Sequence, residues 1–294
     1  DYPRFRRKRH GVDREITPRQ VARHIVGKLH AVRMAAVGIQ PVEPERRDLK
    51  RLVIEHRRHS AVLHACIAHV ASGERHRARE LGKAQVVAKC IKLYSNMDDS
   101  ENYLKQAIVP NDIPFLAVPT TAGTGSEATR YAVIYYNGEK QSVTDESCIP
   151  STVLFDASTL KTLPLYQKKS TMMDAFCHSI ESFWSVNSTD ESKEYSKQAI
   201  RLIMDNMDGY LQNEDESNAN MLRAANLAGK AINITQTTAG HAMCYKLTSL
   251  YGIAHGHAAA LCDVQLLPYM LKHTEQCIDS RGEEYLKTVF KEIA

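Results

Sequence analysis

The sequence lacks several features that define common classes of protein. It contains no run of about eighteen apolar residues, so it predicts no membrane-spanning helix. Its first residues, DYPRFRRKRHG, are charged and no apolar stretch follows them, which predicts no secretory signal. The chain contains seven cysteines, an odd number, and no two of them form a CxxC motif. This pattern is typical of reduced thiols in a cytoplasmic protein and argues against a disulfide scaffold.

The composition that is present is ordinary for a globular protein. The chain has 294 residues, of which 43% are hydrophobic and 24% are charged, so it is not expected to be disordered. This length allows a sizeable core and gives a first expectation of about two domains.

Charge is divided unevenly along the chain. Residues 1–80 contain 16 Arg and 3 Lys against 9 acidic residues, whereas residues 81–294 contain 4 Arg and 15 Lys against 25. Three explanations stay open for the basic part: a solvated surface segment, an arm that binds nucleic acid or a membrane surface, or a stretch translated out of frame. We favour the third, because residues 1–80 contain only two aromatic residues, Tyr2 and Phe5, and show no strand–turn–helix pattern.

After residue 84 the pattern predicts an α/β part and then an all-α part. The expected elements are a helix over 85–94, strands over 113–118, 129–136 and 153–155, a turn at Asn137-Gly138, and helices over 190–211, 217–232 and 258–271. The chain is accordingly divided into an aberrant segment over 1–84, the rest of an α/β domain over 85–157, and a helical domain over 158–294.

Four residues of the helical part are candidate metal ligands. Asp174 and His178 stand four residues apart, which on a helix places a carboxylate and an imidazole on one face. His241 and His255 follow, and Tyr251-Gly252 is expected to end the helix between them. Three imidazoles and one carboxylate suit Fe(II), Zn(II), Mn(II) or Co(II). The alternative is that each histidine is a capped or solvated residue.

A loop of small residues, PTTAGTGSEATR, follows the strand predicted over 113–118. Small residues let a phosphate approach backbone N–H groups, and hydroxyls add donors. The loop is neither a Walker motif nor GxGxxG, so a tight helix-capping loop is an equal interpretation.

Four segments together resemble the iron-containing (group III) alcohol dehydrogenase family: PFLAVPTTAGTGSEATRYAVI, FDASTLKTLP, MMDAFCHSIESFW and AGHAMCYKLTSLYGIAHGHA. Their order and spacing match the family across residues 86–294. The resemblance implies a dehydroquinate-synthase-like architecture, in which a dinucleotide-binding α/β domain precedes a helical metal-binding domain. It implies a metal, Fe(II) or Zn(II), on Asp174, His178, His241 and His255. It also implies NAD or NADP bound by Thr120, Thr121, Thr124, Lys140 and Leu165.

The chain departs from the family in three ways. Tyr245 stands where many members carry a further histidine. Within the family, a tyrosine at this position is most similar to phosphonoacetaldehyde reductases. SGERHRARELGKAQ stands where members carry a Gly-Gly-Gly-Ser turn that binds the pyrophosphate. Members also extend further at the C-terminus, so the helical domain is expected to be truncated and the dinucleotide-binding domain incomplete.

The expected activity is metal-dependent hydride transfer between a nicotinamide cofactor and a small aldehyde or primary alcohol, with phosphonoacetaldehyde as one candidate. His257 or Tyr245, acting through water, are the candidate proton donors, and a packed core tyrosine is the alternative for Tyr245. The other functions considered are an inactive fragment that binds metal without cofactor and an Arg-rich nucleic-acid-binding protein. Expected partners are the small substrate and a second copy in a homodimer; nucleic acid and membrane are not expected.

Overall fold

The structure is a computed structural model that describes residues 6–7, 14–15, 89, 114–136 and 139–293. The chain divides into two compact units, Asp1–His64 and Ala65–Ala294. In the first unit, β1 (Arg6–Arg7) pairs antiparallel with β2 (Arg14–Glu15). The predictions made for residues 1–84 otherwise lie outside the described residues, as does most of the helix predicted over 85–94.

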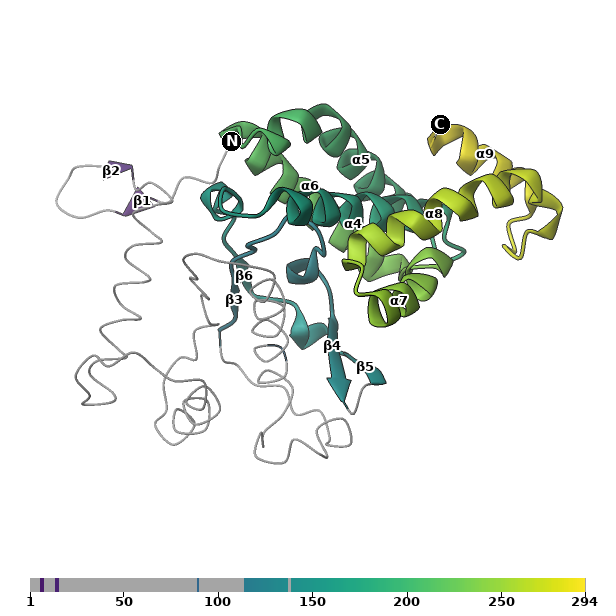
Figure 1. The fold of residues 1–294 in the computed structure, drawn as a ribbon, viewed down its shortest axis with the longest axis horizontal. Helices are drawn as coiled ribbons and strands as arrows, with labels where there is room; N and C mark the ends of the chain where they lie inside the picture. Colours follow the sequence, from purple (N-terminus) through teal and green to yellow (C-terminus); the bar gives the residue numbers. More distant parts are fainter. Residues whose placement is uncertain (1–5, 8–13, 16–88, 90–113, 137–138, 294) are drawn as a thin grey trace. The chain divides into compact units, whose positions relative to one another are not determined.

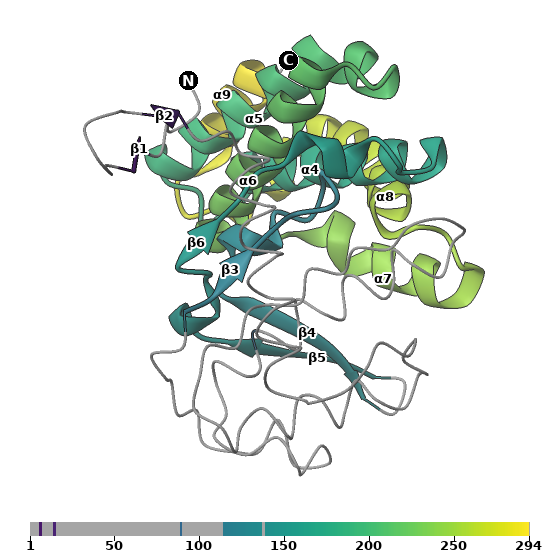
Figure 2. The same ribbon diagram turned by 90° about the vertical axis from the view of Figure 1, so that its left-hand side faces the viewer.

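The α/β part of the second unit contains two small described sheets (Figures 1 and 2). Strand β3 (Leu116–Ala117) pairs in parallel with β6 (Thr152–Val153), and β4 (Tyr131–Tyr136) pairs antiparallel with β5 (Glu139–Thr144). The strands predicted over 113–118, 129–136 and 153–155 are therefore present, although β3 and β6 are shorter or shifted. Tyr136 pairs with Glu139, which leaves a two-residue connection at the predicted turn; those two residues are not described.

Helices dominate after residue 157, as the sequence predicted. They are α4 (Leu165–Trp184), α5 (Asp190–Leu211), α6 (Asp215–Thr235), α7 (Ala239–Tyr251), α8 (His255–Lys272) and α9 (Glu283–Ile293). Short 3-10 helices cover Ser126–Ala128, Glu146–Cys148, Ala157–Leu160 and Thr274–Gln276. None of the helices in the described part of the chain is both long and apolar enough to span a membrane.

Local sequence explains where two helices begin and end. Helix α5 starts at a capping box, in which the backbone N–H of Ser192 donates to Thr189 Oγ1 at 3.1 Å and the N–H of Thr189 donates to Ser192 Oγ at 2.9 Å. Helix α7 stops at Gly252, whose φ of 67° is left-handed. The predicted end at Tyr251-Gly252 is confirmed, and His255 becomes the first residue of α8.

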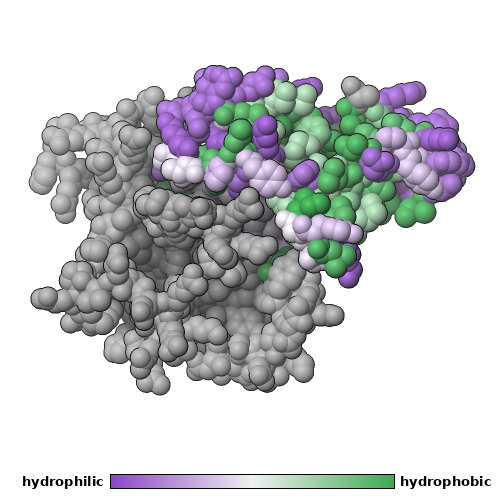
Figure 3. Space-filling model, in the orientation of Figure 1, coloured by the Kyte–Doolittle hydropathy of each residue, from purple (hydrophilic) through white to green (hydrophobic). Residues whose placement is uncertain are grey.

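Helix α4 lies in the middle of the helical part and contributes to three groups of buried side chains. It packs against α5, α6, α8 and α9. One group joins it to α5 and α6, a second to α7 and α8 through Cys177 and Cys244, and a third to α9 through Phe183 and Phe290. The face drawn in Figure 3 shows apolar areas on the helical part. Exposed apolar side chains of α8 include Leu261, Val264 and Leu271.

The small-residue loop and α6 approach each other through two glycines. Gly125, at φ 55°, lies against Gly229 in the middle of α6. A Cβ added at Gly229 would stand 2.3 Å from Gly125 O and 2.8 Å from Gly125 Cα. Because these contacts are with backbone, a side-chain rotation cannot relieve them.

We therefore expect Gly229→Ala to destabilise the protein by about 1–3 kcal/mol, through overpacking. Helix propensity alone predicts the opposite sign, a gain of about 1 kcal/mol. Urea unfolding of the two proteins measures the difference. A variant more stable than the parent would show that the loop does not press against α6.

Candidate metal centre

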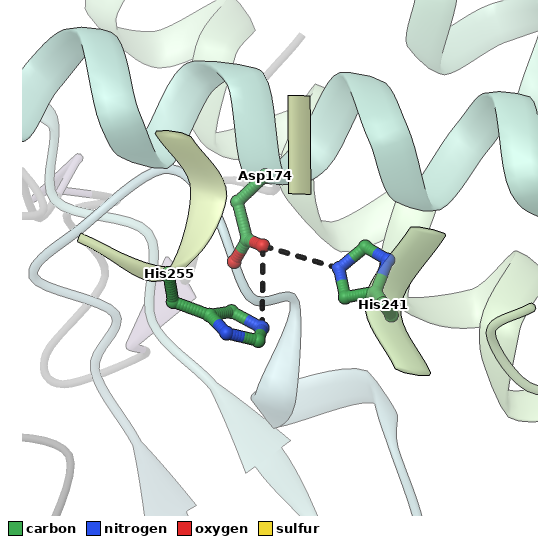
Figure 4. Close-up of side chains that lie close together, drawn as sticks. All are labelled: Asp174, His241 and His255. Atoms are coloured by element: carbon green, nitrogen blue, oxygen red, sulfur yellow. Dashed lines mark hydrogen bonds and ion pairs between the residues drawn. The ribbon is translucent and has the colours of Figure 1, made fainter. Parts of the chain in front are cut away.

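Three side chains from three helices converge in the helical part. They are Asp174 of α4, His241 near the start of α7 and His255 at the start of α8, and their ligand atoms lie within 4.8 Å of one another (Figure 4). Asp174 Oδ1 is 3.4 Å from His241 Nε2 and 3.7 Å from His255 Nε2. Asp174 and His241 are buried, whereas the side chain of His255 is 36% exposed. The group therefore has one side open.

His178 stands beside this group. Its Nε2 is 4.0 Å from Asp174 Oδ1, four residues earlier on α4, and its ring stacks on His241 with 4.5 Å between centroids. Its Nδ1 is buried and has no hydrogen-bond partner among the described residues. The Nε2 atoms of all three histidines thus lie within 4.0 Å of one carboxylate oxygen, although His178 is outside the group whose ligand atoms all lie within 4.8 Å of one another.

These spacings fit a bound divalent ion. Two ligands on one tetrahedral ion, each about 2.1 Å from it, are about 3.4 Å apart. The distances from Asp174 Oδ1 to His255 and His178 are too long for hydrogen bonds, yet the groups are buried or half-buried and face one another. The residues present therefore fit a metal ion of the borderline type that imidazole and carboxylate favour.

A close approach between α4 and the start of α8 places His255. A Cβ added at Gly256 would lie 2.0 Å from Ser170 O and 2.7 Å from Asp174 Cβ. Only glycine therefore allows the two backbones to lie this close. The residue before it is consequently held next to Asp174.

The charges of the group are strongly coupled. Burial raises the pKa of Asp174, but the three neighbouring histidines, His178 first, outweigh it and hold that pKa well below its usual range. Burial lowers the pKa of His178 to about 4. Burial also disfavours the charged form of His241, yet hydrogen bonds to Asp174 and Glu181 raise its pKa to about 10. Without an ion, His241 therefore carries the positive charge that balances Asp174.

Sequence reasoning missed two buried carboxyl groups next to His241. Glu181 of α4 accepts hydrogen bonds from His241 and Thr238, and these lower its pKa although burial raises it. Asp263 of α8 is 7% exposed and lies next to Glu181 and Cys177. Burial and then the charge of Glu181 raise its pKa. The sequence contained one signal for Glu181: it stands seven residues after Asp174, which places both carboxyl groups on the same face of a helix.

The two candidate proton donors lie on α7 and α8, next to His255 in space and in sequence respectively. The ring of Tyr245 stacks on His255 at 5.4 Å between centroids, and Tyr245 also packs against the buried cluster that contains Cys177. His257 is exposed, and its Nδ1 is 3.1 Å from the hydroxyl of Tyr166. Tyr166 was not predicted from the sequence.

The candidate cofactor residues fall on the loop after β3 and on the start of α4. Thr120 and Thr121 are half-buried, whereas Thr124 and Leu165 are exposed. Lys140 lies in β5, opposite Tyr135 in the register; its side chain is not described.

The loop is tied to the helical part. A Cβ at Gly123 would meet Thr171, one turn before Asp174 on α4. The loop's far end is held by Lys89, whose Nζ donates to Ser126 O at 2.8 Å and Thr129 O at 2.6 Å. The structure thus connects the loop to the helix that carries Asp174.

Comparison with known proteins identifies relatives of this arrangement. A model described as "Iron-containing alcohol dehydrogenase" matches residues 82–157, and one described as "Fe-containing alcohol dehydrogenase family, C-terminal" matches residues 168–293. The phosphonoacetaldehyde reductase of Streptomyces viridochromogenes is 33% identical over 192 residues, which are 63% of this chain and 48% of that protein. The sulfoacetaldehyde reductase of Bilophila wadsworthia is 34% identical, over 58% of this chain and 45% of the relative.

Solved structures agree. The sulfoacetaldehyde reductase of Bifidobacterium kashiwanohense in complex with NAD+ has a TM-score of 0.62 at 25% identity, over 81% of this chain and 64% of that chain. An iron-containing alcohol dehydrogenase of Thermotoga maritima has a TM-score of 0.57 at 27% identity, over 71% and 57% of the two chains. The chain spans about half the length of the curated relatives it matches. The two family models together cover well over half of the sequence, and the chain belongs to the iron-containing alcohol dehydrogenase family.

Proposed function

We propose that this chain is a metal-dependent oxidoreductase that transfers a hydride between a nicotinamide cofactor and a small aldehyde or primary alcohol. The observation that carries the proposal is the convergence of three imidazole nitrogens on Asp174 Oδ1 at 3.4–4.0 Å. We assign Asp174, His178, His241 and His255 as ligands of one divalent ion, Fe(II) or Zn(II). When bound, the ion polarises the substrate carbonyl and the nicotinamide, from NAD or NADP, supplies or accepts the hydride.

The chain's own residues hold the reactants. Thr120, Thr121 and Thr124 offer hydroxyl and backbone donors to the dinucleotide, and Lys140 and Leu165 complete the proposed contacts. Residues 85–157 are assigned to the dinucleotide-binding domain and residues 158–294 to the metal-binding domain.

Substrate contacts are assigned to the open side of the metal group. Tyr245 shapes the pocket next to His255. His257 passes a proton between the substrate oxygen and solvent through water, since its ring is exposed and hydrogen-bonded to Tyr166; Tyr245 is the second candidate for this role. Two relatives are named for aldehydes that carry an acidic group, which supports an anionic aldehyde such as phosphonoacetaldehyde as substrate.

A second candidate function is metal binding without turnover. Residues 72–85, SGERHRARELGKAQ, contain no Gly-Gly-Gly-Ser turn, and the first family model matches only from residue 82. Backbone N–H groups at such a turn are the main donors to a pyrophosphate. This candidate predicts a chain that keeps its metal centre and has lost its dinucleotide site.

The assignment of ligands predicts the effect of single replacements. Asp174→Ala, His178→Ala, His241→Ala and His255→Ala should each weaken metal binding by more than the roughly 10- to 100-fold that loss of an outer partner costs. Competition with a chromophoric chelator measures the affinity. His273→Ala is the control, because His273 contacts Glu275 and Tyr269 and none of the four ligands. Equal affinity in all five variants would refute the assignment.

The missing turn predicts slow catalysis by the chain as it stands. We expect the metal-loaded protein to oxidise NADH or NADPH with phosphonoacetaldehyde or acetaldehyde only slowly. A chimera in which a relative's segment with the Gly-Gly-Gly-Ser turn replaces residues 1–85 should react faster, because the pyrophosphate donors return. Absorbance at the nicotinamide band gives both rates. A chimera that binds metal and dinucleotide but transfers no hydride would leave only the second candidate function.

The position of Tyr245 predicts an effect on specificity. Tyr245→Phe should change the ratio of kcat/KM between phosphonoacetaldehyde and acetaldehyde, because it removes a hydroxyl that we propose to hydrogen-bond the acidic group of the substrate. Steady-state kinetics of the turn-restored chimera supply the ratio. An unchanged ratio together with a lower Tm would mean that Tyr245 serves packing alone.

A further inference from the structure

Glu181 is a fully buried carboxylate that receives four hydrogen bonds from the start of α7. One oxygen, Oε2, accepts from the backbone N–H of Thr238 and from Thr238 Oγ1, the latter at 2.7 Å. The other oxygen, Oε1, accepts from the backbone N–H of His241 at 3.0 Å and from His241 Nδ1. All these partners are at least 57 residues away in sequence, so this side chain joins α4 to the start of α7.

Two of these bonds, those from the backbone N–H groups of Thr238 and His241, make Glu181 the N-terminal cap of α7. The first N–H groups of a helix lack partners within the helix and carry partial positive charge. Thr238 precedes α7, and its own side chain makes no capping hydrogen bond. A carboxylate from α4 takes its place, which fixes where α7 begins and therefore where the backbone of His241 lies.

The bond to Nδ1 sets the direction of the imidazole ring. With Nδ1–H directed to Glu181, Nε2 points to the side where Asp174 Oδ1 stands 3.4 Å away. A carboxylate on the far nitrogen also increases the basicity of a histidine ligand. Nδ1 of His255 lies 3.4 Å from Cys244 Sγ, and Nδ1 of His178 has no hydrogen-bond partner among the described residues.

We propose that Glu181 is a positioning residue of the metal centre, which orients His241 Nε2 toward the ion and anchors the helix that carries it. The inference rests on the proposed function, since it presumes that His241 is a ligand. A purely structural cap would stabilise α7 without affecting the ion. The two roles can be separated by experiment. Only a positioning role predicts that a variant which still folds binds the metal more weakly.

The test compares Glu181→Gln with the parent protein in the absence of substrate. Glutamine keeps the size of the side chain but loses the charge and one acceptor oxygen. Chelator competition with Zn(II) should show an affinity about 10- to 100-fold lower. Asp279→Asn is the matched control: Asp279 is also a buried carboxylate with several hydrogen bonds, all from Arg281. It should lower Tm and leave Zn(II) affinity unchanged.

Two further variants keep the result decisive. Thr238→Ala removes the bonds that Thr238 Oγ1 makes with Glu181 and Trp184 and keeps both bonds from Glu181 to His241. It should therefore lower Tm while metal affinity changes less than threefold, or about 0.6 kcal/mol. If Glu181→Gln does not fold, Glu181→Asp replaces it, and the same loss of affinity is expected because the shorter carboxylate cannot span Thr238 and His241. Unchanged Zn(II) affinity in the folded Glu181 variant would overturn this inference alone, whereas a parent protein that binds no ion would overturn the metal centre itself.

Discussion

The helical part depends on compensation of two carboxylates buried on one face of α4. Asp174 is 3% exposed and Glu181 is fully buried, and an unpaired charge in such a place is very costly. The partners come from α7 and α8: imidazoles for Asp174, and the N-terminus of α7 for Glu181. Both helices must therefore begin beside α4, which is the arrangement that brings the histidines together.

The side chains on the polar face of α4 are held in place because the neighbouring backbones pack closely around this helix. Gly256 lets α8 approach the backbone of α4, and Gly229 lets the small-residue loop lie against α6. Apolar side chains then fill the remaining faces of α4 toward α5, α6 and α9. A site on packed helices holds its side chains more firmly than one on loops, so the spacing of the nitrogen atoms is maintained by the core.

His241 lies between the two buried carboxylates and offsets part of their charge. Hydrogen bonds to Asp174 and Glu181 stabilise the protonated imidazole of His241 and keep its pKa at about 10 despite burial. One imidazolium between two carboxylates leaves a net negative charge on these three residues. A divalent ion held at the proposed centre would supply positive charge in the place of the proton on Nε2, while the bond from Nδ1 to Glu181 would stay.

The sequence by itself determined the helices of residues 158–294, the strand–loop–strand order before them, and the candidate ligands, because these follow from local periodicity, capping residues and the pattern of four matching segments. It placed the end of α7 at Gly252 and the whole of α5 correctly. Only the tertiary structure decided that Glu181 binds the far side of His241, that Asp263 is buried next to Glu181, and that Tyr166 meets His257. These pairs join residues that are far apart in the chain, and their contacts depend on how closely whole helices pack, which no local pattern of residues specifies.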